Sequence, residues 1–375
     1  MALIHYLVPV HFDCGAIRLL PAELKRLGLQ APLIVTDRGL AGLLSRLAQW
    51  LPPLDDGRVF ADTPENPTEA AVTRAAALYR ERGCDSIVAI GGGSPLDLAK
   101  GAALLATHKG PLTRYAAVAG GMDLVTPAVA PVIAVPTTAG TGSEVGRATV
   151  VVMADGHKRA IVSPHLLPRL AICDPELTVS LPPRLTAGTG MDAIAHCIET
   201  FLSPADNPPA EAIALDGLAR AVAHLPRACA DGGDLIGRRE MMMASLQGGL
   251  AFQKGLGAVH AMSHPLGALP GLTVHHGTAN AILLPAVLRF NEPACAAKYA
   301  RLRGALGLRP GTDLAAWARD FTARLGLPVS LRQVGVPREA LPRLAEAATL
   351  DFSARTNPRP ASAADYLRLY HEAHE

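Results

Sequence analysis

Strand-like and helix-like segments alternate through the first half of the chain, and this alternation limits the possible folds more than any other feature. Two buried β-branched runs, APLIVTD ending at Asp37 and DSIVAI ending at Ile90, alternate with segments that have the spacing of amphipathic helices: residues 18–29 precede the first run, and residues 66–82 precede the second. Parallel strands need such crossover helices, so the pattern favours a parallel sheet with helices packed on it. We predict a Rossmann-like α/β domain over residues 1–181.

Strand-like runs stop near Pro182, and Ala/Leu-rich helical patterns broken by proline and glycine continue to the end of the chain. We therefore predict an all-α helical domain over residues 182–375. Of the 375 residues, 49% are hydrophobic and 18% are charged, which provides enough apolar sequence for two domains with their own cores.

The composition argues against several classes of protein. A net charge of +2 with scattered charges, and an aromatic content of 4%, do not suit a nucleic-acid surface. The N-terminus lacks the basic start and apolar run of a signal peptide, and no apolar stretch reaches the roughly eighteen residues of a membrane span. Six dispersed cysteines without a Cys-x-x-Cys pair suit reduced thiols. We expect a cytoplasmic enzyme whose partners include neither nucleic acid nor a membrane.

A glycine-rich junction follows the second buried strand, in the sequence GGGSPLDLAK. Ser94 suits a helix N-cap, Pro95 the first helical position and Asp97 the third position of a capping box, so a helix N-terminus is expected at the glycines. Such an end presents backbone N–H groups to an anion such as a pyrophosphate. The alternative is a tight strand-to-helix turn, which needs one glycine and not three. The predicted cofactor-binding residues here are Gly91, Gly92, Gly93, Ser94 and Asp97.

A second polar, glycine-rich loop follows another buried strand, in the sequence PTTAGTGSEV. Gly140 and Gly142 supply backbone freedom, and strand-like sequence resumes at Ala148. Ligands of open α/β sheets bind beyond the carboxyl ends of the strands, so two such loops indicate one cleft, although hydroxyl-rich loops can also be simple turns. The predicted cofactor-binding residues of this loop are Thr137, Thr138, Thr141 and Ser143.

Histidines gather in the predicted helical half. Residues 256–280 carry four of the chain's thirteen histidines, and His260 and His264 stand four residues apart there. Asp192 and His196 have the same spacing, so each pair projects from one face of a helix. One such pair belongs more often to a core or a surface than to a metal site. Two pairs in small, apolar sequence are costly to bury unless something binds them, which favours a divalent metal site.

Six long motifs resemble, in the right order and over essentially the whole chain, those of the iron-containing, group III alcohol dehydrogenases. They are GGGSPLDLAK (91–100), PTTAGTGSEV (136–145), DPELTVSLPP (174–183), TAGTGMDAIAHCIE (186–199), HAMSHPLGA (260–268) and HGTANAILLP (276–285). The resemblance implies a dehydroquinate-synthase-like α/β domain, a helical domain and a nicotinamide cofactor in a cleft between them. NAD is the expected cofactor and NADP the alternative.

The resemblance also implies roles for single residues. By motif match the metal ligands are Asp192, His196, His260 and His276, with Fe²⁺ as the expected ion and Zn²⁺ as the alternative. His264 matches a family histidine near the nicotinamide, and an imidazole there is suited to relay a proton near neutral pH. Its alternative role is to orient His260 by a hydrogen bond. Lys158 matches a lysine that contacts the cofactor, with a solvated surface lysine as the alternative.

Oxidising an alcohol by hydride transfer requires loss of the hydroxyl proton, which a Lewis-acidic metal ion favours. We predict a metal-dependent, NAD(P)-linked alcohol dehydrogenase or aldehyde reductase that acts on a primary alcohol or aldehyde and forms a homo-oligomer, specifically a dimer. Maleylacetate reductase, glycerol-1-phosphate dehydrogenase and dehydroquinate synthase are alternatives with a related fold. A metal-binding protein without enzymatic activity is a further alternative, and it leaves both glycine-rich loops unexplained.

Three residues bear on specificity. Asp37 ends a strand where an acidic residue accepts the ribose hydroxyls and repels a 2′-phosphate, which predicts preference for NAD over NADP, although the adjacent Arg38 opposes it. Arg147 follows the second loop and is a candidate to bind an anionic tail, as in 4-hydroxybutyrate or succinic semialdehyde. The alternative for Arg147 is a structural ion pair with Glu144 or Asp155.

The fourth metal ligand has two candidates, because this sequence departs from the family at His275 and His276. The family usually has proline before its ligand histidine, where this chain has Val274-His275. Alignment from His264 favours His275, whereas alignment from Gly277 and the helix after it favours His276. We predict that His276 is the ligand, because a loop absorbs an extra residue more readily than a helix does.

Overall fold

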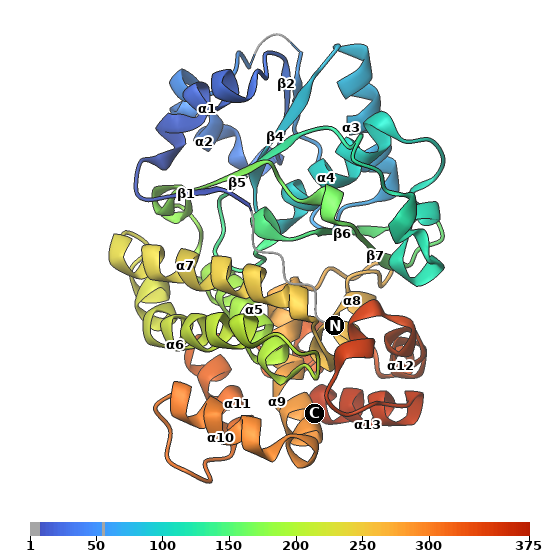
Figure 1. Ribbon diagram of the computed structural model, residues 1–375. Helices are drawn as coiled ribbons and strands as arrows, with labels where there is room; N and C mark the ends of the chain where they lie inside the picture. Colours follow the sequence, from blue (N-terminus) through green and yellow to red (C-terminus); the bar gives the residue numbers. More distant parts are fainter. Residues whose placement is uncertain (1–7, 55–56) are drawn as a thin grey trace. The chain divides into compact units, whose positions relative to one another are not determined.

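A computed structural model describes residues 8–54 and 57–375 (Figure 1). Contacts divide these residues into two compact units. One unit, here called the α/β unit, comprises residues 8–138 and Ser143–Val179, and the other, the helical unit, comprises Ala139–Gly142 and Ser180–Glu375. The chain thus leaves the α/β unit for the four residues Ala139–Gly142 and then returns to it.

A six-stranded parallel sheet forms the centre of the α/β unit, as the alternation of strands and helices predicts. The two central strands, β5 and β4, pair from Ile87 opposite Val132 to Gly91 opposite Pro136. Across the sheet the strands are β1 (Val10–Phe12), β8 (Leu170–Cys173), β5 (Val132–Pro136), β4 (Ser86–Gly91), β2 (Pro32–Val35) and β3 (Val59–Phe60).

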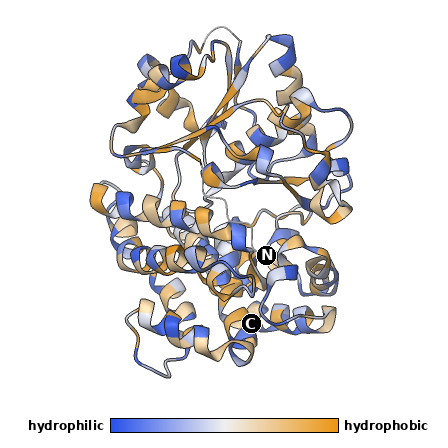
Figure 2. Cartoon of the chain, in the orientation of Figure 1, coloured by the Kyte–Doolittle hydropathy of each residue, from blue (hydrophilic) through white to orange (hydrophobic). Residues whose placement is uncertain are grey.

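Helices cover both faces of this sheet. Leu33 and Val35 of β2 pack in one apolar cluster with α3 and α4, whereas Ile34 between them packs in another cluster with α1 and α2. Successive strand residues point to opposite faces, so a strand covered on both sides is apolar throughout, and Figure 2 shows the central strands as apolar. The four helices are α1 (Leu20–Leu27), α2 (Ala41–Leu47), α3 (Glu69–Glu81) and α4 (Gly93–Thr107).

The start of α4 differs from the prediction. Gly92 is the N-cap and Gly93 the first helical residue, and no side chain caps this end. The predicted capping by Ser94 is wrong, because the hydroxyl of Ser94 donates instead to the carbonyl of Glu65, at 2.5 Å. The helix therefore begins inside the glycine run, and its first N–H groups lie at the glycines themselves.

A separate antiparallel hairpin, β6 (Ala148–Val152) with β7 (Lys158–Val162), completes the α/β unit. The residues described after Pro182 contain helices and no strand, which confirms the predicted helical second half. Within the described chain no helix is both long and apolar enough to cross a membrane. The helices of this half are α5 (Pro183–Leu202), α6 (Pro208–Ala230), α7 (Leu235–Ala251), α8 (Ala258–Leu266), α9 (His276–Asn291), α10 (Ala296–Ala305), α11 (Leu314–Arg324), α12 (Leu341–Leu350) and α13 (Ala363–His374).

Helices α5 and α9 form the buried centre of the helical unit. From Thr186 to Leu202 nearly every side chain of α5 is buried, and α9 is buried from Gly277 almost to its end. A helix buried on all sides has no solvated face on which to place polar side chains. The buried polar residues of α5 and α9 must therefore find their partners inside the protein.

Candidate active site

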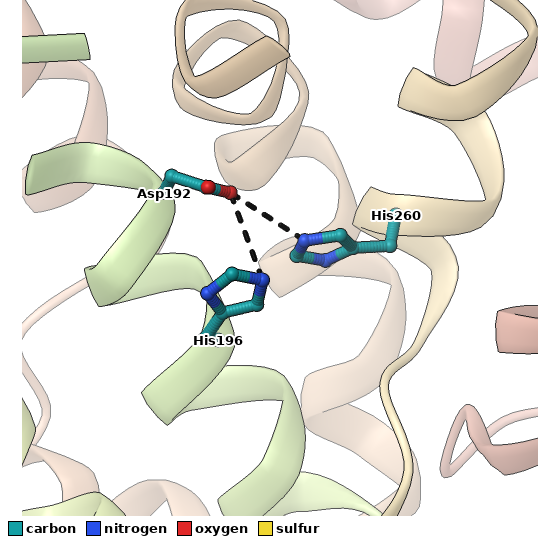
Figure 3. A group of neighbouring side chains, drawn as sticks. All are labelled: Asp192, His196 and His260. Atoms are coloured by element: carbon teal, nitrogen blue, oxygen red, sulfur yellow. Dashed lines mark ion pairs between the residues drawn. The ribbon is translucent and has the colours of Figure 1, made fainter. Parts of the chain in front are cut away.

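Three buried residues of the helical unit form a cluster that can hold a metal ion (Figure 3). Oδ1 of Asp192 lies 3.8 Å from Nε2 of His196, one helical turn later on α5. Nε2 of His260, on α8, lies 3.5 Å from the same oxygen. The three candidate ligand atoms all lie within 4.8 Å of one another. One carboxylate oxygen and two imidazole nitrogens that converge in this way suit Fe²⁺ or Zn²⁺.

Hydrogen bonds on the far side of each imidazole direct its Nε2 atom toward Asp192. Nδ1 of His260 donates to Oε2 of Glu199 at 2.6 Å, and Oε1 of Glu199 accepts from the backbone N–H of Val259. Nδ1 of His196 donates to the carbonyl of Gly140 at 3.2 Å. An acceptor at Nδ1 fixes the tautomer in which Nε2 carries the lone pair, as metal-binding histidines require.

The charges of the cluster also suit a cation. Burial alone would raise the pKa of Asp192, but the neighbouring His196, His276 and His260 hold that pKa well below its ordinary value. Burial lowers the pKa of His196 to about 4, so this imidazole is neutral at neutral pH. Burial would likewise lower the pKa of His260, but hydrogen bonds to Asp192 and Glu199 outweigh it and raise the pKa to about 9, so a metal ion that binds here must displace a proton from this imidazole.

The two consecutive histidines have different surroundings. Nε2 of His276 lies 3.6 Å from Oδ1 of Asp192, and 29% of this side chain is exposed. His275 is the N-cap of α9, where its Nδ1 accepts from the backbone N–H of Thr278 at 3.3 Å. The position of His275 at the helix end gives it a structural role that His276 does not have.

His264 lies beside the cluster and is held by a carboxylate. Its Nδ1 donates to Oδ2 of Asp351 at 2.8 Å, and Oδ1 of Asp351 accepts from the backbone N–H of Ser353. The ring of His264 stacks on that of His276 with centroids 5.5 Å apart and meets the ring of His260 edge-on at 5.9 Å. The alternative in which His264 orients His260 by a hydrogen bond has no support here, because Glu199 takes that position.

Two glycines let α5 and α9 approach closely enough to bring Asp192 and His276 together. A Cβ atom at Gly277 would lie 2.0 Å from the carbonyl oxygen of Gly188, and a Cβ atom at Gly188 would lie 2.7 Å from Nδ1 of His275. A larger residue at Gly277 would separate the helices, because the obstacle is backbone, and one at Gly188 would displace the ring of His275. Gly188 of the motif TAGTG and Gly277 of the motif HG thus allow the close helix packing that forms the cluster.

The two glycine-rich loops follow the paired strands β4 and β5 and begin next to each other. The backbone N–H of Thr137 donates to the carbonyl of Gly91 at 2.9 Å. A Cβ atom at Gly92 would lie 3.1 Å from the methyl carbon of Thr138, and one at Gly91, whose φ is +153°, would meet Pro95 at 2.5 Å. Both glycines therefore bring backbone into positions that a side chain would block.

Asp97, Lys100 and Ser143 tie the second loop to α4. Oδ1 of Asp97 accepts from the hydroxyl of Ser143 at 2.6 Å, and its Oδ2 accepts from the backbone N–H of Val150. Nζ of the buried Lys100 donates to the carbonyl of Ser143 at 2.6 Å and to the hydroxyl of the same residue at 2.8 Å. The carboxylate of Asp97 thus positions the loop from within the α/β unit.

Gly140 and Gly142 of the second loop pack against helices of the helical unit. A Cβ atom at Gly140 would lie 2.4 Å from the carbonyl oxygen of Thr189 on α5. Gly142 has a φ of +63°, and a Cβ atom there would lie 2.4 Å from the Cα atom of Gly249 on α7. These glycines allow close backbone approach, and Thr141 lies between them in the same segment.

The remaining predicted cofactor residues lie elsewhere on the α/β unit. Asp37 follows β2, the parallel neighbour of β4, and its carboxylate accepts from the backbone N–H of Gly39 at 2.9 Å. The adjacent Arg38 forms an exposed ion pair with Asp62 at 2.7 Å. Lys158, at the start of β7, donates from Nζ to the side-chain oxygen of Asn66 at 2.9 Å.

Four residues that contact this machinery were not singled out by sequence. Glu199 follows Asp192 and His196 at helical spacing, and Asn280 follows His276 by one turn, so in both cases a signal was present. The side-chain amide of Asn280 contacts Asp192. The other two, Lys100 and Asp351, reach their partners through the tertiary fold, and no local pattern marks them.

The α/β unit carries two glycine-rich loops, and the helical unit buries a carboxylate among imidazoles. These features are typical of a metal-dependent dehydrogenase. Family models agree with this assignment: "Iron-containing alcohol dehydrogenase" matches residues 9–175, and "Fe-containing alcohol dehydrogenase family, C-terminal" matches residues 186–374. The chain belongs to the iron-containing alcohol dehydrogenase family and is an oxidoreductase that acts on CH–OH groups, as the motifs predict.

Individual members of the family are similar to this chain over essentially their whole length. The chain is 54% identical over 382 aligned residues to 4-hydroxybutyrate dehydrogenase of Cupriavidus necator, with 100% of both chains covered. Its fold is similar to that of a 1,3-propanediol oxidoreductase, with a TM-score of 0.91, 36% identity and coverage of 99% and 100% of the two chains. It is also similar to sulfoacetaldehyde reductase of Bifidobacterium kashiwanohense in complex with NAD⁺, with a TM-score of 0.87, 30% identity and coverage of 100% and 99%.

Proposed function

We propose that this protein is an NAD-dependent dehydrogenase that interconverts 4-hydroxybutyrate and succinic semialdehyde. The observation that carries the proposal is the buried cluster of Asp192, His196 and His260, in a chain that is 54% identical over its whole length to a 4-hydroxybutyrate dehydrogenase. In the forward direction the alcohol loses a hydride to NAD⁺ and a proton to the protein and solvent, which yields the aldehyde and NADH.

The residues of the cluster fit the metal ion that the family name implies. The ligand atoms converge in a buried space, and their imidazoles are held in the correct tautomer by Glu199 and Gly140. We propose Fe²⁺ as the ion, with Zn²⁺ as the alternative and His276 as the fourth ligand. When bound, the ion supplies Lewis acidity toward the alcohol or carbonyl oxygen.

His264 is the proposed proton relay. Asp351 accepts the Nδ1–H of this imidazole, which leaves Nε2 as the atom that takes up or releases a proton. Burial alone would raise the pKa of Asp351, but His264 and the hydrogen bonds from Ser353 lower it, so this carboxylate stays ionised as the acceptor. His264 therefore has an orientation suited to this step.

The cofactor is proposed to bind at the two glycine-rich loops. The N–H groups at Gly92 and Gly93 open α4 at the carboxyl edge of the sheet, which is where a pyrophosphate is bound in related α/β folds. The predicted contacts of Ser94, Thr137, Thr138 and Thr141 remain part of this proposal. Asp97 and Ser143 already bind each other, so their contribution is to hold the second loop in position.

The proposed substrate ends in a carboxylate, and Arg147 is the proposed group that binds it. Arg147 is half-buried in the connection between the second loop and β6. Burial lowers the pKa of its guanidinium, but an arginine remains charged at neutral pH. Of the two carboxylates considered as structural partners of Arg147, Asp155 forms an ion pair with Arg159 at 2.7 Å. A structural pair of Arg147 with Glu144 stays the alternative.

NADH formation measured by absorbance tests the activity and the substrate together. We expect kcat/KM for 4-hydroxybutyrate to exceed that for 1-butanol and for 1,3-propanediol, and turnover to stop on chelation and return with Fe²⁺.

Replacing Arg147→Ala should raise KM for 4-hydroxybutyrate by about 10- to 100-fold, the equivalent of one charged hydrogen bond, and leave KM for 1-butanol unchanged. Arg159→Ala is the matched control. Equal losses on both alcohols in Arg147→Ala reject the anion-binding role, and turnover by metal-free protein rejects the metal.

Preference for NAD over NADP is a separate prediction. Asp37 lies at the carboxyl edge of the sheet, and the ion pair with Asp62 withholds the charge of Arg38 from a 2′-phosphate. We expect Asp37→Gly to raise the NADP/NAD ratio of kcat/KM by about tenfold or more, since one unfavourable charge contact is removed. Asp62→Ala, which releases Arg38, should raise it as well. A ratio that stays at the wild-type value in Asp37→Gly excludes this residue from cofactor selection.

One broader expectation accompanies the proposal. The predicted assembly is a homodimer, and light scattering during gel filtration measures it directly. A monomer at the concentrations used for kinetics contradicts that expectation and leaves the proposed chemistry unaffected.

A further inference from the structure

Asn280 lies beside the ligand atoms of the candidate metal centre. It lies on α9 one turn after His276 and is fully buried. Its Nδ2 atom is 2.7 Å from Oδ1 of Asp192, 3.3 Å from Nε2 of His260 and 3.2 Å from Nε2 of His276. A single amide nitrogen thus lies within reach of the ligand atoms contributed by three different helices.

The orientation of this amide is determined by Asp192. If the amide turned over, its carbonyl oxygen would face a carboxylate oxygen, and both groups would then be acceptors. The observed orientation leaves Oδ1 of Asn280 buried, and no described residue donates to it. Asn291 on the same helix differs, because its amide exchanges two hydrogen bonds with Asn357, at 2.9 and 2.8 Å. Asn280 therefore donates a hydrogen bond to Asp192 while its own carbonyl oxygen is buried without a donor, which costs free energy.

We propose that Asn280 is a positioning residue of the metal centre, whose amide N–H group holds the carboxylate of Asp192 in place for metal binding. This inference rests on the proposed metal-dependent function. An imidazole Nε2 has one lone pair. His260 or His276 therefore cannot accept a hydrogen bond from Asn280 while the same nitrogen ligates a metal ion. A carboxylate oxygen has two lone pairs, and the hydrogen bond to Asp192 is compatible with a metal ion on the same oxygen.

Asn280 acts on Asp192 as Glu199 acts on His260. Each ligand of the cluster is then restrained by a group that does not bind the metal: Asn280 restrains the carboxylate, and Glu199 and Gly140 restrain the two imidazoles. Loss of such a partner lowers metal affinity by about 10- to 100-fold, because the ligand must be ordered when the metal binds. The predicted effect of removing Asn280 is therefore on metal affinity.

Zinc titration of metal-free protein against a competing chelator measures this effect without reference to activity. We expect Asn280→Ala and the larger Asn280→Leu to raise the Kd for Zn²⁺ by 10- to 100-fold. Two replacements are needed because one of them may fold poorly, and circular dichroism of each metal-free variant checks this. Asn291→Ala is the matched control, because it removes a buried asparagine amide from the same helix without touching the ligands. The absorption bands of bound Co²⁺ should also change in the Asn280 variants, since Asp192 is no longer restrained.

The outcomes separate this inference from the function on which it rests. Wild-type affinity and wild-type Co²⁺ bands in a folded Asn280 variant overturn the positioning role and leave the metal-dependent function intact. An equal loss in Asn291→Ala also overturns it, because the effect then comes from destabilising α9. Failure of the wild-type protein to bind Zn²⁺ or Co²⁺ at all rejects the metal-dependent function together with the role of Asn280.

Discussion

Replacing His276→Ala removes the metal ion and the dehydrogenase activity together, whereas His275→Ala retains most of the metal. This is the expected result, because Nε2 of His276 faces the carboxylate of Asp192 at 3.6 Å, while Nδ1 of His275 accepts from the start of α9. Loss of a ligand should cost more than the roughly 100-fold in metal affinity that loss of an outer hydrogen-bonding partner costs. Metal content by plasma emission spectrometry, measured beside kcat, checks the prediction.

The His275→Ala variant is itself the control, and its own effect is different in kind. It removes the N-cap of α9, which typically costs about 1 kcal/mol of stability and should lower the melting temperature. The reverse pattern, with metal lost in His275→Ala and kept in His276→Ala, would falsify the assignment and make His275 the fourth ligand.

Cofactor binding is expected to be abolished by Gly92→Val while the metal centre survives. A Cβ atom at Gly92 already meets Thr138 at 3.1 Å, and valine adds two γ-carbons to the space at the N-cap of α4. A bound pyrophosphate needs that space. Isothermal calorimetry with NAD should show a loss of at least about 100-fold in affinity, which corresponds to about 2.7 kcal/mol.

Two measurements distinguish this effect from misfolding. The metal ligands belong to the helical unit, so metal content should stay at the wild-type level in Gly92→Val. Gly42→Val is the matched control, because a Cβ atom at Gly42 in α2 meets nothing within 4 Å. Unchanged NAD affinity in Gly92→Val shows that the glycine run is only a turn, and the proposed cofactor site must then lie elsewhere.

Periodicity made the main architecture predictable. The run around Leu33, Ile34 and Val35 is apolar without alternation, which indicates a strand covered on both faces, and the structure distributes these residues between two helical layers. Asp192 and His196 were recognised as one helix face by their spacing, and they lie together in the buried cluster. Local sequence is informative in both cases because the interacting groups belong to one element or to neighbouring elements.

Contacts between residues that are far apart in the sequence could not be predicted, because they depend on the three-dimensional fold. Asp351 lies 87 residues after His264, and no pattern in the sequence connects them. Ser94 has the composition of an N-cap, yet its hydroxyl donates to Glu65, so a tertiary contact prevails over a local preference. Gly140 was predicted to give backbone freedom, whereas its lack of a side chain serves close packing against Thr189. Such contacts become visible only when the partners are placed in space.

The hydrogen bond from His196 to the carbonyl of Gly140 has a thermodynamic consequence. Gly140 belongs to the loop that contains Thr137 and Thr138, the proposed cofactor residues, so in the proposed site one short stretch of backbone would contact both the cofactor and a metal ligand. If binding of either one shifts this carbonyl, the affinities become coupled, and the coupling must be reciprocal. The factor by which NAD changes the dissociation constant of the metal then equals the factor by which the metal changes that of NAD. If the proposed cofactor site is correct, the second loop would thus transmit the binding of one ligand to the affinity of the other.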